Sequence, residues 1–255
     1  MEAYSPPPQV ITLEVRNHSA VVHRRRQSYI ALMEQANNDL HMYWDHRQVD
    51  KKWLYAVAPE FRVPFVERIR EIGHDEPWSD DQATWRVTIY DYPYQALDDH
   101  GSGSLPVNAL RSIGYHFVDD RTPHIVLYAG LGQQSGIPWT LTFSHELLET
   151  LVDSQAETIV DPEPGRARYE LEICDPVQFQ SYPIHGVWVS NFVTPHWFDM
   201  PPQGAPEEAD GLRYDFGGQL IGPRQRSLGG TRSLRLDGRD RSETLTGFGQ
   251  VVKTH

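Results

Sequence analysis

The segment "SHELLETLVD", residues 144–153, places His145, Glu146 and Glu149 in the spacing H-E-x-x-E. On an α-helix, residues four apart lie one above the other, so the imidazole of His145 and the carboxylate of Glu149 can bind the same ion. Glu146 follows at about 100° around the helix, where its carboxylate can act as a base toward a metal-bound water. The spacing therefore indicates a metal site.

An amphipathic surface helix is the alternative interpretation of the same segment. On a helical wheel of residues 141–153, the apolar side chains fall on one arc and the polar ones, including His145, Glu149 and Asp153, fall on the other. A solvated polar face that happens to carry His and Glu gives the same pattern. Amphipathicity alone leaves both interpretations open.

A catalytic zinc site usually takes three protein ligands and keeps one position for water, so a third ligand has to come from beyond the helix. The segment "YELEICDPV", residues 169–177, offers three carboxylates for this purpose: Glu170, Glu172 and Asp175.

The elements that must position these residues are predicted from hydrophobic periodicity and turn residues. A helix is predicted over about residues 25–45, and a short helical piece over 63–73. Strands are predicted at 10–15, 53–58 and 85–92, and within 108–120 and 123–130. A hairpin is predicted in "SYPIHGVWVSNFV", residues 181–193, turning at "HG".

Composition limits the class of protein. The 255 residues carry a formal charge of −12, which disfavours nucleic acid as a partner. No apolar run is long enough to span a bilayer, so no membrane partner is predicted, and the start of the chain lacks the features of a signal peptide. A single cysteine, Cys174, excludes an internal disulfide. The expected location is the cytoplasm, with secretion by a route without a cleaved signal as an alternative.

Four blocks of the sequence resemble those of a group of mostly uncharacterised bacterial proteins. These blocks are "SHELLETLVD", "ELEICDPV", "GVWVSNFVTPHWF" and "IGYH", and the resemblance runs from about residue 29 to 222. The group looks like zincins, the broad class of metallopeptidases that includes thermolysin. The resemblance implies a zincin-like fold, a mixed sheet with an active-site helix, and one zinc ion per chain.

Carried over residue by residue, the resemblance makes His145, Glu149 and Glu172 the metal ligands and Glu146 the catalytic base. Asp175 would stand nearby as a carboxylate that orients His145, a role that such partners take at metal sites. Glu149 stands where the zincin pattern has His. Two carboxylate ligands would leave the ion more neutral than two histidines and one carboxylate.

His116, in "IGYH", is a further candidate catalytic residue. It lies on a predicted strand that leads toward the site, and its imidazole could stabilise an oxyanion, a task that needs a donor near the developing charge. The alternative for His116 is a partly buried side chain that only forms a structural hydrogen bond.

Together these observations predict an α+β protein with a zincin-like metallopeptidase fold. Residues 1–155 would form an N-terminal lobe with the sheet and the active-site helix, and residues 156–255 a loop-rich C-terminal lobe that supplies the third metal ligand. The predicted function is zinc-dependent hydrolysis of a peptide or protein substrate, with Glu146 activating a metal-bound water. The alternative is a non-catalytic binding or structural protein that keeps the metal only for stability. The sequence gives no indication of the oligomeric state.

Overall fold

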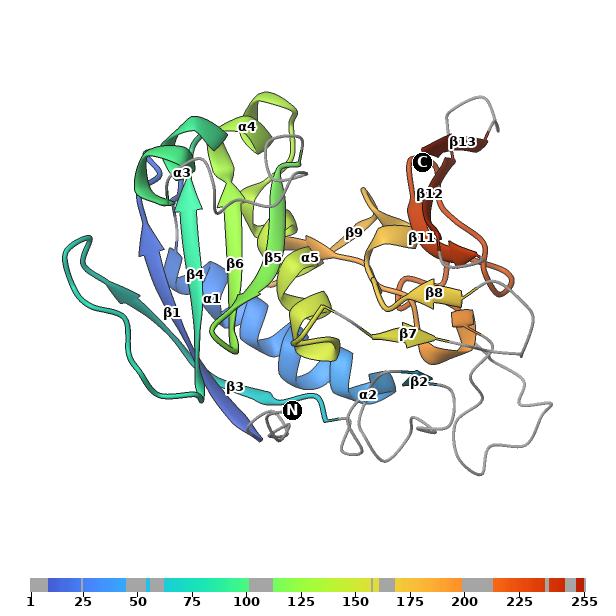
Figure 1. The fold of residues 1–255 in the computed structure, drawn as a ribbon, viewed down its shortest axis with the longest axis horizontal. Helices are drawn as coiled ribbons and strands as arrows, with labels where there is room; N and C mark the ends of the chain where they lie inside the picture. Colours follow the sequence, from blue (N-terminus) through green and yellow to red (C-terminus); the bar gives the residue numbers. More distant parts are fainter. Residues whose placement is uncertain are drawn as a thin grey trace.

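The structure is a computed structural model and describes residues 9–23, 25–44, 54–55, 62–100, 112–156, 158–160, 168–198, 213–236, 239–245 and 251–254. A five-stranded mixed sheet organises its N-terminal half, with the strand order β3-β1-β4-β6-β5 (Figure 1). The first four strands in this order run parallel, and the edge strand β5 runs antiparallel to β6. The strands are β1 (Val10–Asn17), β3 (Phe65–Ile72), β4 (Thr84–Tyr90), β5 (Gly114–Asp119) and β6 (Thr122–Tyr128).

Most of the predicted strands of this half are present. Strands β1, β4 and β6 confirm the predictions at residues 10–15, 85–92 and 123–130. Strand β5 confirms the prediction within 108–120, of which residues 108–111 lie outside the described chain. In the predicted strand 53–58, only β2 (Leu54–Tyr55) is described.

The predicted helix at 63–73 is wrong, because this segment is strand β3, paired in parallel with β1. Its buried and half-buried apolar side chains Val66, Ile69 and Ile72 recur every three residues, which resembles helical periodicity. An irregularity of the ladder between Ile11 and Thr12 leaves Glu67 without a partner residue on β1 and brings Val66 and Ile69 to the same face. Ile72 follows after a regular stretch and therefore lies on the opposite face from Ile69. An extra residue in one strand interrupts the two-residue alternation on which the prediction of a strand depends.

The predicted helix over 25–45 is confirmed as a continuous helical segment. It comprises α1 (Arg25–Glu34), a π-helical stretch η1 (Gln35–Leu40) and α2 (His41–Trp44). Helices α1 and α5 (Trp139–Val152) pack on the same face of the five-stranded sheet. The main core lies between them, where side chains such as Leu13, Val87 and Leu127 are completely buried. Burial of this apolar surface is the main favourable term in folding.

A smaller apolar cluster covers the other face of the sheet. Tyr90, Val126 and Tyr128 pack there with Ala96 of α3 (Pro93–His100), and Tyr115 and Phe117 of β5 lean against them. Because side chains alternate along a strand, this arrangement turns Gly114 and His116 of β5 toward the opposite face, where α5 lies.

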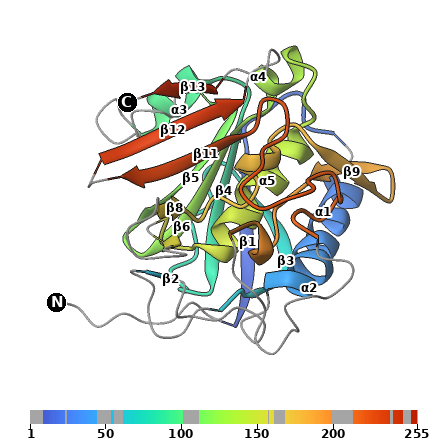
Figure 2. The same ribbon diagram turned by 90° about the vertical axis from the view of Figure 1, so that its right-hand side faces the viewer.

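The C-terminal half contributes a six-stranded sheet with the order β13-β12-β11-β8-β7-β2 (Figure 2). It contains β2 of the N-terminal half, whose partner is β7. The predicted boundary at residue 155 lies in the connection between α5 and β7. The other strands are β7 (Ile159–Val160), β8 (Arg168–Glu170), β11 (Thr231–Leu236), β12 (Arg239–Leu245) and β13 (Val251–Thr254).

The predicted hairpin in residues 181–193 is confirmed as β9 (Ser181–Ile184) and β10 (Val187–Ser190). Its turn residues His185 and Gly186 both have positive φ, 50° and 77°. Two consecutive positive φ angles are what a two-residue hairpin turn of type I′ requires. Strand β10 packs against α5 and so brings the hairpin to the candidate site.

The fold is therefore a mixed α+β arrangement with a central mixed sheet, as predicted. Figure 1 shows α5 between the five-stranded sheet and the strands of the C-terminal half. Among the described residues, no helix is long and apolar enough to cross a membrane.

Candidate metal centre

Helix α5, which carries the H-E-x-x-E residues, is buried on nearly all sides. It packs against β10 of the hairpin and against β5 and β6 of the sheet. The polar side chains of its supposed solvent face are buried: Glu146 is 7% exposed and Glu149 is 3% exposed. A buried carboxylate is costly unless it is paired, hydrogen-bonded or bound to a cation. The interpretation of this segment as a solvated surface helix is therefore wrong.

His145, Glu149 and Asp175 form the first group of converging donor atoms. His145 Nε2 lies 3.3 Å from Glu149 Oε2 and 3.6 Å from Asp175 Oδ1. The first pair is the i,i+4 pair that the spacing predicts. Ligand atoms about 2.1 Å from a tetrahedral ion are separated by about 3.4 Å, so these distances suit a small cation.

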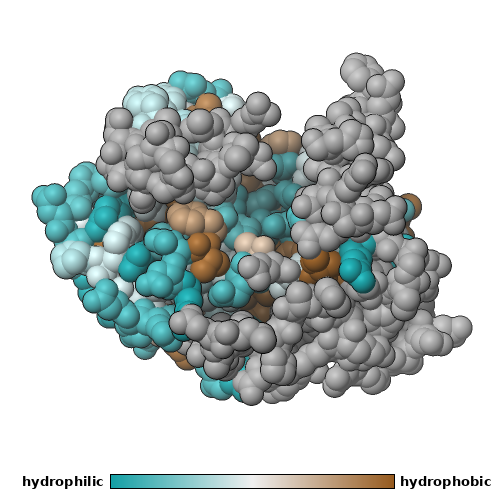
Figure 3. Space-filling model, in the orientation of Figure 1, coloured by the Kyte–Doolittle hydropathy of each residue, from teal (hydrophilic) through white to brown (hydrophobic). Residues whose placement is uncertain are grey.

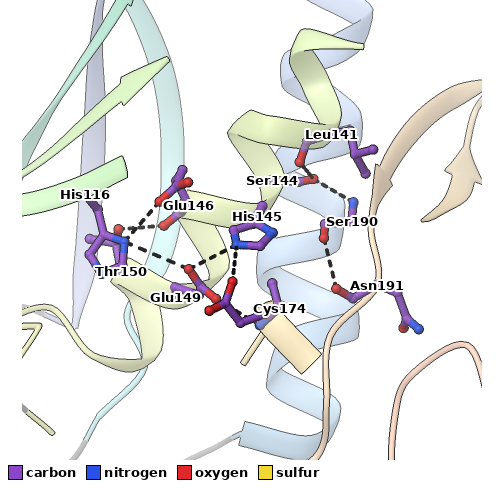
Figure 4. A network of polar contacts seen from close by, with 11 residues as sticks. His116, Leu141, Ser144, His145, Glu146, Glu149, Thr150, Cys174, Ser190 and Asn191 are labelled. Atoms are coloured by element: carbon purple, nitrogen blue, oxygen red, sulfur yellow. Dashed lines mark hydrogen bonds and ion pairs between the residues drawn. The ribbon is translucent and has the colours of Figure 1, made fainter. Parts of the chain in front are cut away.

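Strand β5 brings a second histidine to the other side of Glu149. His116 Nδ1 donates a hydrogen bond of 3.1 Å to Glu146 Oε2 and lies 4.0 Å from Glu149 Oε2. His116, Glu146 and Glu149 form the second group of donor atoms that could hold an ion. In Figure 4, Glu149 lies between the two histidines, and Glu146 lies on the side of His116.

Gly114 allows β5 to approach α5 this closely. A Cβ atom at this position would lie 2.5 Å from Thr142 Cγ2 and 3.1 Å from Glu146 Oε1. No real Cβ makes a contact as short as the first of these, so a residue with a side chain would force the strand or the helix to move. Gly114 is thus part of what places the Glu146 carboxylate, a role that its position in the block "IGYH" did not predict.

The segment after β8 reaches the same helix from the C-terminal half. The backbone N–H of Cys174 donates a hydrogen bond of 3.0 Å to Glu149 Oε1, and both groups are buried. Ile173 and Val177 are completely buried on either side and fix the segment in the core. The next residue after Cys174, Asp175, begins the short 3₁₀ helix η3 (Asp175–Val177) and turns its carboxylate toward His145.

Glu172, the predicted third ligand, contacts Glu149 through a hydrogen bond between their carboxyl groups. Within the described residues it belongs to neither group of three converging donor atoms, whereas Asp175 belongs to the first. Asp175 approaches the same nitrogen of His145 that faces Glu149. A carboxylate that only orients a ligand histidine would contact the other ring nitrogen, so the geometry favours Asp175 as a donor.

The charges of the group hold His145 and Glu149 in ionised forms. Burial alone would lower the pKa of His145, but the charge of Glu149 and hydrogen bonds to Asp175 and Glu149 raise this pKa well above its usual value. Burial raises the pKa of Glu149, but the charge and hydrogen bond of His145 outweigh burial and bring this pKa to about 2. The pair therefore forms an ion pair in the protein without metal.

The pKa of Glu172 shifts in the opposite direction to that of Glu149. Burial, the charge of Glu149 and the charge of Asp175 all raise its pKa well above the usual value. The site thus draws protons onto His145 and Glu172 to balance its carboxylates. A cation placed among the same atoms would balance this charge without those protons, and a set of imidazole and carboxylate donors suits zinc or manganese. The residues present therefore fit a divalent metal ion.

Two further contacts fix the helix and were not predicted. The Ser144 hydroxyl accepts a hydrogen bond of 2.7 Å from the Ser190 N–H and donates one to the Leu141 carbonyl. Strand β10 is therefore bound to α5 at the residue immediately before His145. At the other end, Asp153 accepts hydrogen bonds from the backbone N–H and the hydroxyl of Thr158. The Ser144 position within "SHELLETLVD" was visible in the sequence, but its partner is a backbone group, which leaves no signal.

A cavity of about 600 Å³ opens beside the site, and His145 and Glu146 form part of its wall. The apolar part of the wall comes from Ile113, Ile137, Leu141 and Phe179. Figure 3 shows this face hollowed near its middle, where hydrophobic and hydrophilic surfaces meet. A concave, partly apolar space with a few converging polar groups is typical of a small-molecule or peptide site.

Comparison of the chain with protein-family models, with curated proteins and with solved structures finds no match. The geometry of the site is therefore the basis for the functional proposal.

Proposed function

We propose that this protein is a metal-dependent hydrolase, with zinc as the metal and a peptide bond as the target. One observation carries the proposal: a buried group of His145, Glu149 and Asp175 lies next to an additional carboxylate, Glu146, at the wall of a cavity. A metal site that only stabilised the fold would have no need of a base facing an open space.

His145, Glu149 and Asp175 would hold the ion, and Glu172 would support Glu149 through their hydrogen bond. When bound, a divalent ion at these donors polarises the substrate carbonyl and acidifies water. The proton transfers are carried out by a side chain of the protein. Glu146 accepts a proton from the attacking water and passes it to the leaving amine.

His116 acts on Glu146 in this proposal. Its hydrogen bond of 3.1 Å to Glu146 Oε2 fixes the orientation of the carboxylate and leaves Oε1 on the side of Gly114. This contact supports a positioning role for His116 more directly than the predicted stabilisation of an oxyanion, because its Nδ1 already forms a hydrogen bond with Glu146.

The fold supports the same class. The zincin resemblance implies a mixed sheet with an active-site helix, and here α5 packs beside the antiparallel edge strand β5 of a mixed sheet. None of the described residues that line the cavity is Lys, Arg or Asp, and Glu146 is its only carboxylate. We therefore expect apolar or small polar side chains, rather than acidic ones, next to the cleaved bond.

The test is the Glu146→Gln variant, assayed against a mixed peptide library after reconstitution with one equivalent of zinc. The amide keeps the shape of the side chain and loses its basicity, so we expect a loss of about 10²–10⁴-fold in turnover with little change in bound zinc. The matched control is Glu14→Gln, which alters another buried glutamate, on β1, with its own contact to the Ser79 N–H at 2.9 Å.

Equal turnover by the wild-type protein and Glu146→Gln would exclude a base at this position. Absence of cleavage by the wild-type protein, with zinc bound, would favour the alternative of a metal-stabilised binding or structural protein. In that case removal of zinc should lower the melting temperature and have no other effect.

A further inference from the structure

The donor atoms around Glu149 form two groups rather than one. The first contains His145 and Asp175, the second contains His116 and Glu146, and Glu149 is common to both. In each group the three ligand atoms lie within 4.8 Å of one another. The same oxygen faces both histidines, because Glu149 Oε2 lies 3.3 Å from His145 Nε2 and 4.0 Å from His116 Nδ1.

We propose that the protein has a second, lower-affinity site for a divalent metal ion, formed by His116, Glu146 and Glu149, and that an ion bound there inhibits the enzyme by occupying its base. The metal site itself stands on the geometry of the three side chains. The inhibition rests on the proposed function.

The composition of the second group suits a cation. It combines one imidazole with two carboxylates, the same donor types as the first group, and its carboxylates are buried. The distance from His116 Nδ1 to Glu146 Oε2, 3.1 Å, is close to the separation of about 3.4 Å between two ligands of a tetrahedral zinc ion. The His116–Glu149 distance of 4.0 Å has to shorten, and the Glu146 and Glu149 oxygens already lie within 4.8 Å of each other.

The total charge of the site also favours a second ion. Glu146, Glu149 and Asp175 carry three negative charges when ionised, while Glu172 holds the proton of its hydrogen bond to Glu149, and a single divalent ion balances two of the three charges. A second divalent ion would offset the remaining charge in a region that water screens poorly. Glu149 can serve both ions, because a carboxylate has about four lone-pair positions and only one of its oxygens accepts the Cys174 N–H.

Lower affinity follows from two features. The second ion must displace the hydrogen bond between His116 and Glu146, and it must bind beside an ion of the same charge. Two-metal sites in enzymes hold their ions about 3.5–4 Å apart, a separation that a shared carboxylate allows. We therefore expect the second dissociation constant to exceed the first by about tenfold or more.

Inhibition follows from the identity of the ligands. A cation bound to the Glu146 carboxylate stabilises its ionised form and lowers its basicity, so the side chain no longer takes a proton from water efficiently. Turnover should therefore rise as the first equivalent of zinc is added and fall as the second binds. The activity of the protein would then depend on the concentration of free zinc.

The experiment is a titration of metal-stripped protein with zinc chloride, with bound zinc measured by equilibrium dialysis and elemental analysis. We expect two ions per chain in the wild-type protein. His116→Ala and His116→Gln should each bind one ion, with the affinity of the tighter site changed little. His185→Ala is the matched control for adventitious binding, because His185 forms an exposed pair with Glu34 at 2.8 Å and should not affect the count.

Loading with manganese supplies an independent readout. Two Mn²⁺ ions that share Glu149 should give an exchange-broadened magnetic resonance spectrum, whereas the His116 variants should give the six-line spectrum of an isolated ion. Circular dichroism of the variants verifies that they fold. The two substitutions differ in size and polarity, so agreement between them excludes a packing defect as the cause.

Saturation of the wild-type protein at one ion, or two ions in both His116 variants, would overturn the second site. The ratio of turnover at one equivalent to turnover at excess zinc tests the inhibition, and it should fall toward unity in the His116 variants. Binding of two ions at saturation, together with no hydrolysis at one equivalent of zinc, would refute the proposed function and leave the second metal site supported. Hydrolysis with only one bound ion would do the reverse.

Discussion

The backbone N–H of Cys174 donates a hydrogen bond of 3.0 Å to Glu149 Oε1, so a residue of the C-terminal half fixes a carboxylate on α5. Glu149 has a second oxygen, Oε2, that faces His145. One side chain thus joins the two halves of the site and supplies a donor to it. Its structural and metal-binding contributions can be separated by substitution.

Glu149→Gln and Glu149→Ala, compared without metal, isolate the structural contribution. Both remove the charge that faces His145, but only Gln keeps a side-chain oxygen for the buried Cys174 N–H. A buried donor left unpaired costs about 1–3 kcal/mol, so we expect the Ala variant to be less stable than the Gln variant by at least this amount. Denaturant unfolding in the presence of a chelator measures the difference. Equal stabilities would mean that water replaces the lost acceptor.

Gly114→Ala should lower turnover while leaving zinc affinity nearly unchanged. The added Cβ would lie 2.5 Å from Thr142 Cγ2 and close to Glu146, so it pushes β5 away from the base but not from Asp175. Overpacking of this kind costs about 1–3 kcal/mol. The double variant Gly114→Ala with Thr142→Ser removes the methyl group that collides and should recover most of the loss. Absence of recovery would show that Thr142 is not the obstacle.

Asp175→Asn and Glu172→Gln rank the two candidate donors of the C-terminal half. Asp175 faces His145 Nε2 at 3.6 Å, so its loss as a ligand should weaken zinc binding by more than about 100-fold, beyond the 10–100-fold typical of supporting residues. The amide introduced by Glu172→Gln can still donate a hydrogen bond to Glu149, so we expect a loss of about tenfold or less. Competition with a fluorescent chelator gives both constants. The reverse order would establish Glu172 as the third ligand, as the sequence resemblance predicts.

The stability of the metal-free protein should decrease as pH rises above neutral. The pKa of His145 is raised in the folded state, so its stabilisation is complete below the usual value of 6.5 and is lost as pH rises through the folded-state value. Glu172, with its raised pKa, acts in the same direction above its usual value of 4.5. Glu149, with a pKa of about 2, loses its contribution only in acid. Maximum stability should therefore lie near about pH 4.5, with a steeper decrease above about pH 6.5, where the contribution of His145 is lost as well.

Thermal unfolding with a chelator at a series of pH values measures this profile. His145→Gln should flatten the fall above about pH 6.5, and an unchanged slope would show that other groups cause it. Zinc should restore stability most strongly at high pH, because the ion then competes with no proton on His145.

The sequence predicted the pair of His145 and Glu149 because a helix imposes their proximity through spacing alone. It predicted β1, β4 and β6 because their apolar, β-branched residues lie between clear turn signals. It failed at β3, where an irregular pairing changes the spacing of Val66 and Ile69. Local patterns therefore indicate local geometry only while the ladder is regular.

Contacts between distant segments could not be predicted in the same way. The sequence offered Glu170, Glu172 and Asp175, but which of them faces His145 depends on the turn η3 and on the Cys174 amide. The pairing of His116 with Glu146 depends on the register of β5 and on the absence of a side chain at Gly114. Backbone groups and close approaches of this type leave no periodic trace in a sequence.

The early helical segment has a consequence for the order of events during synthesis. Gln35 Nε2 donates to the Ser190 carbonyl and Trp44 Nε1 to the Val193 carbonyl, across 155 and 149 positions of the chain. Because Ser190 also bonds Ser144, α5 lacks one of its packing partners, β10, until residue 190 has left the ribosome. The carboxylates of the site would then be assembled late, in a nearly finished chain. Contacts this distant in sequence slow folding, so the surface of α5 that β10 covers should stay exposed in the nascent chain until the hairpin has formed.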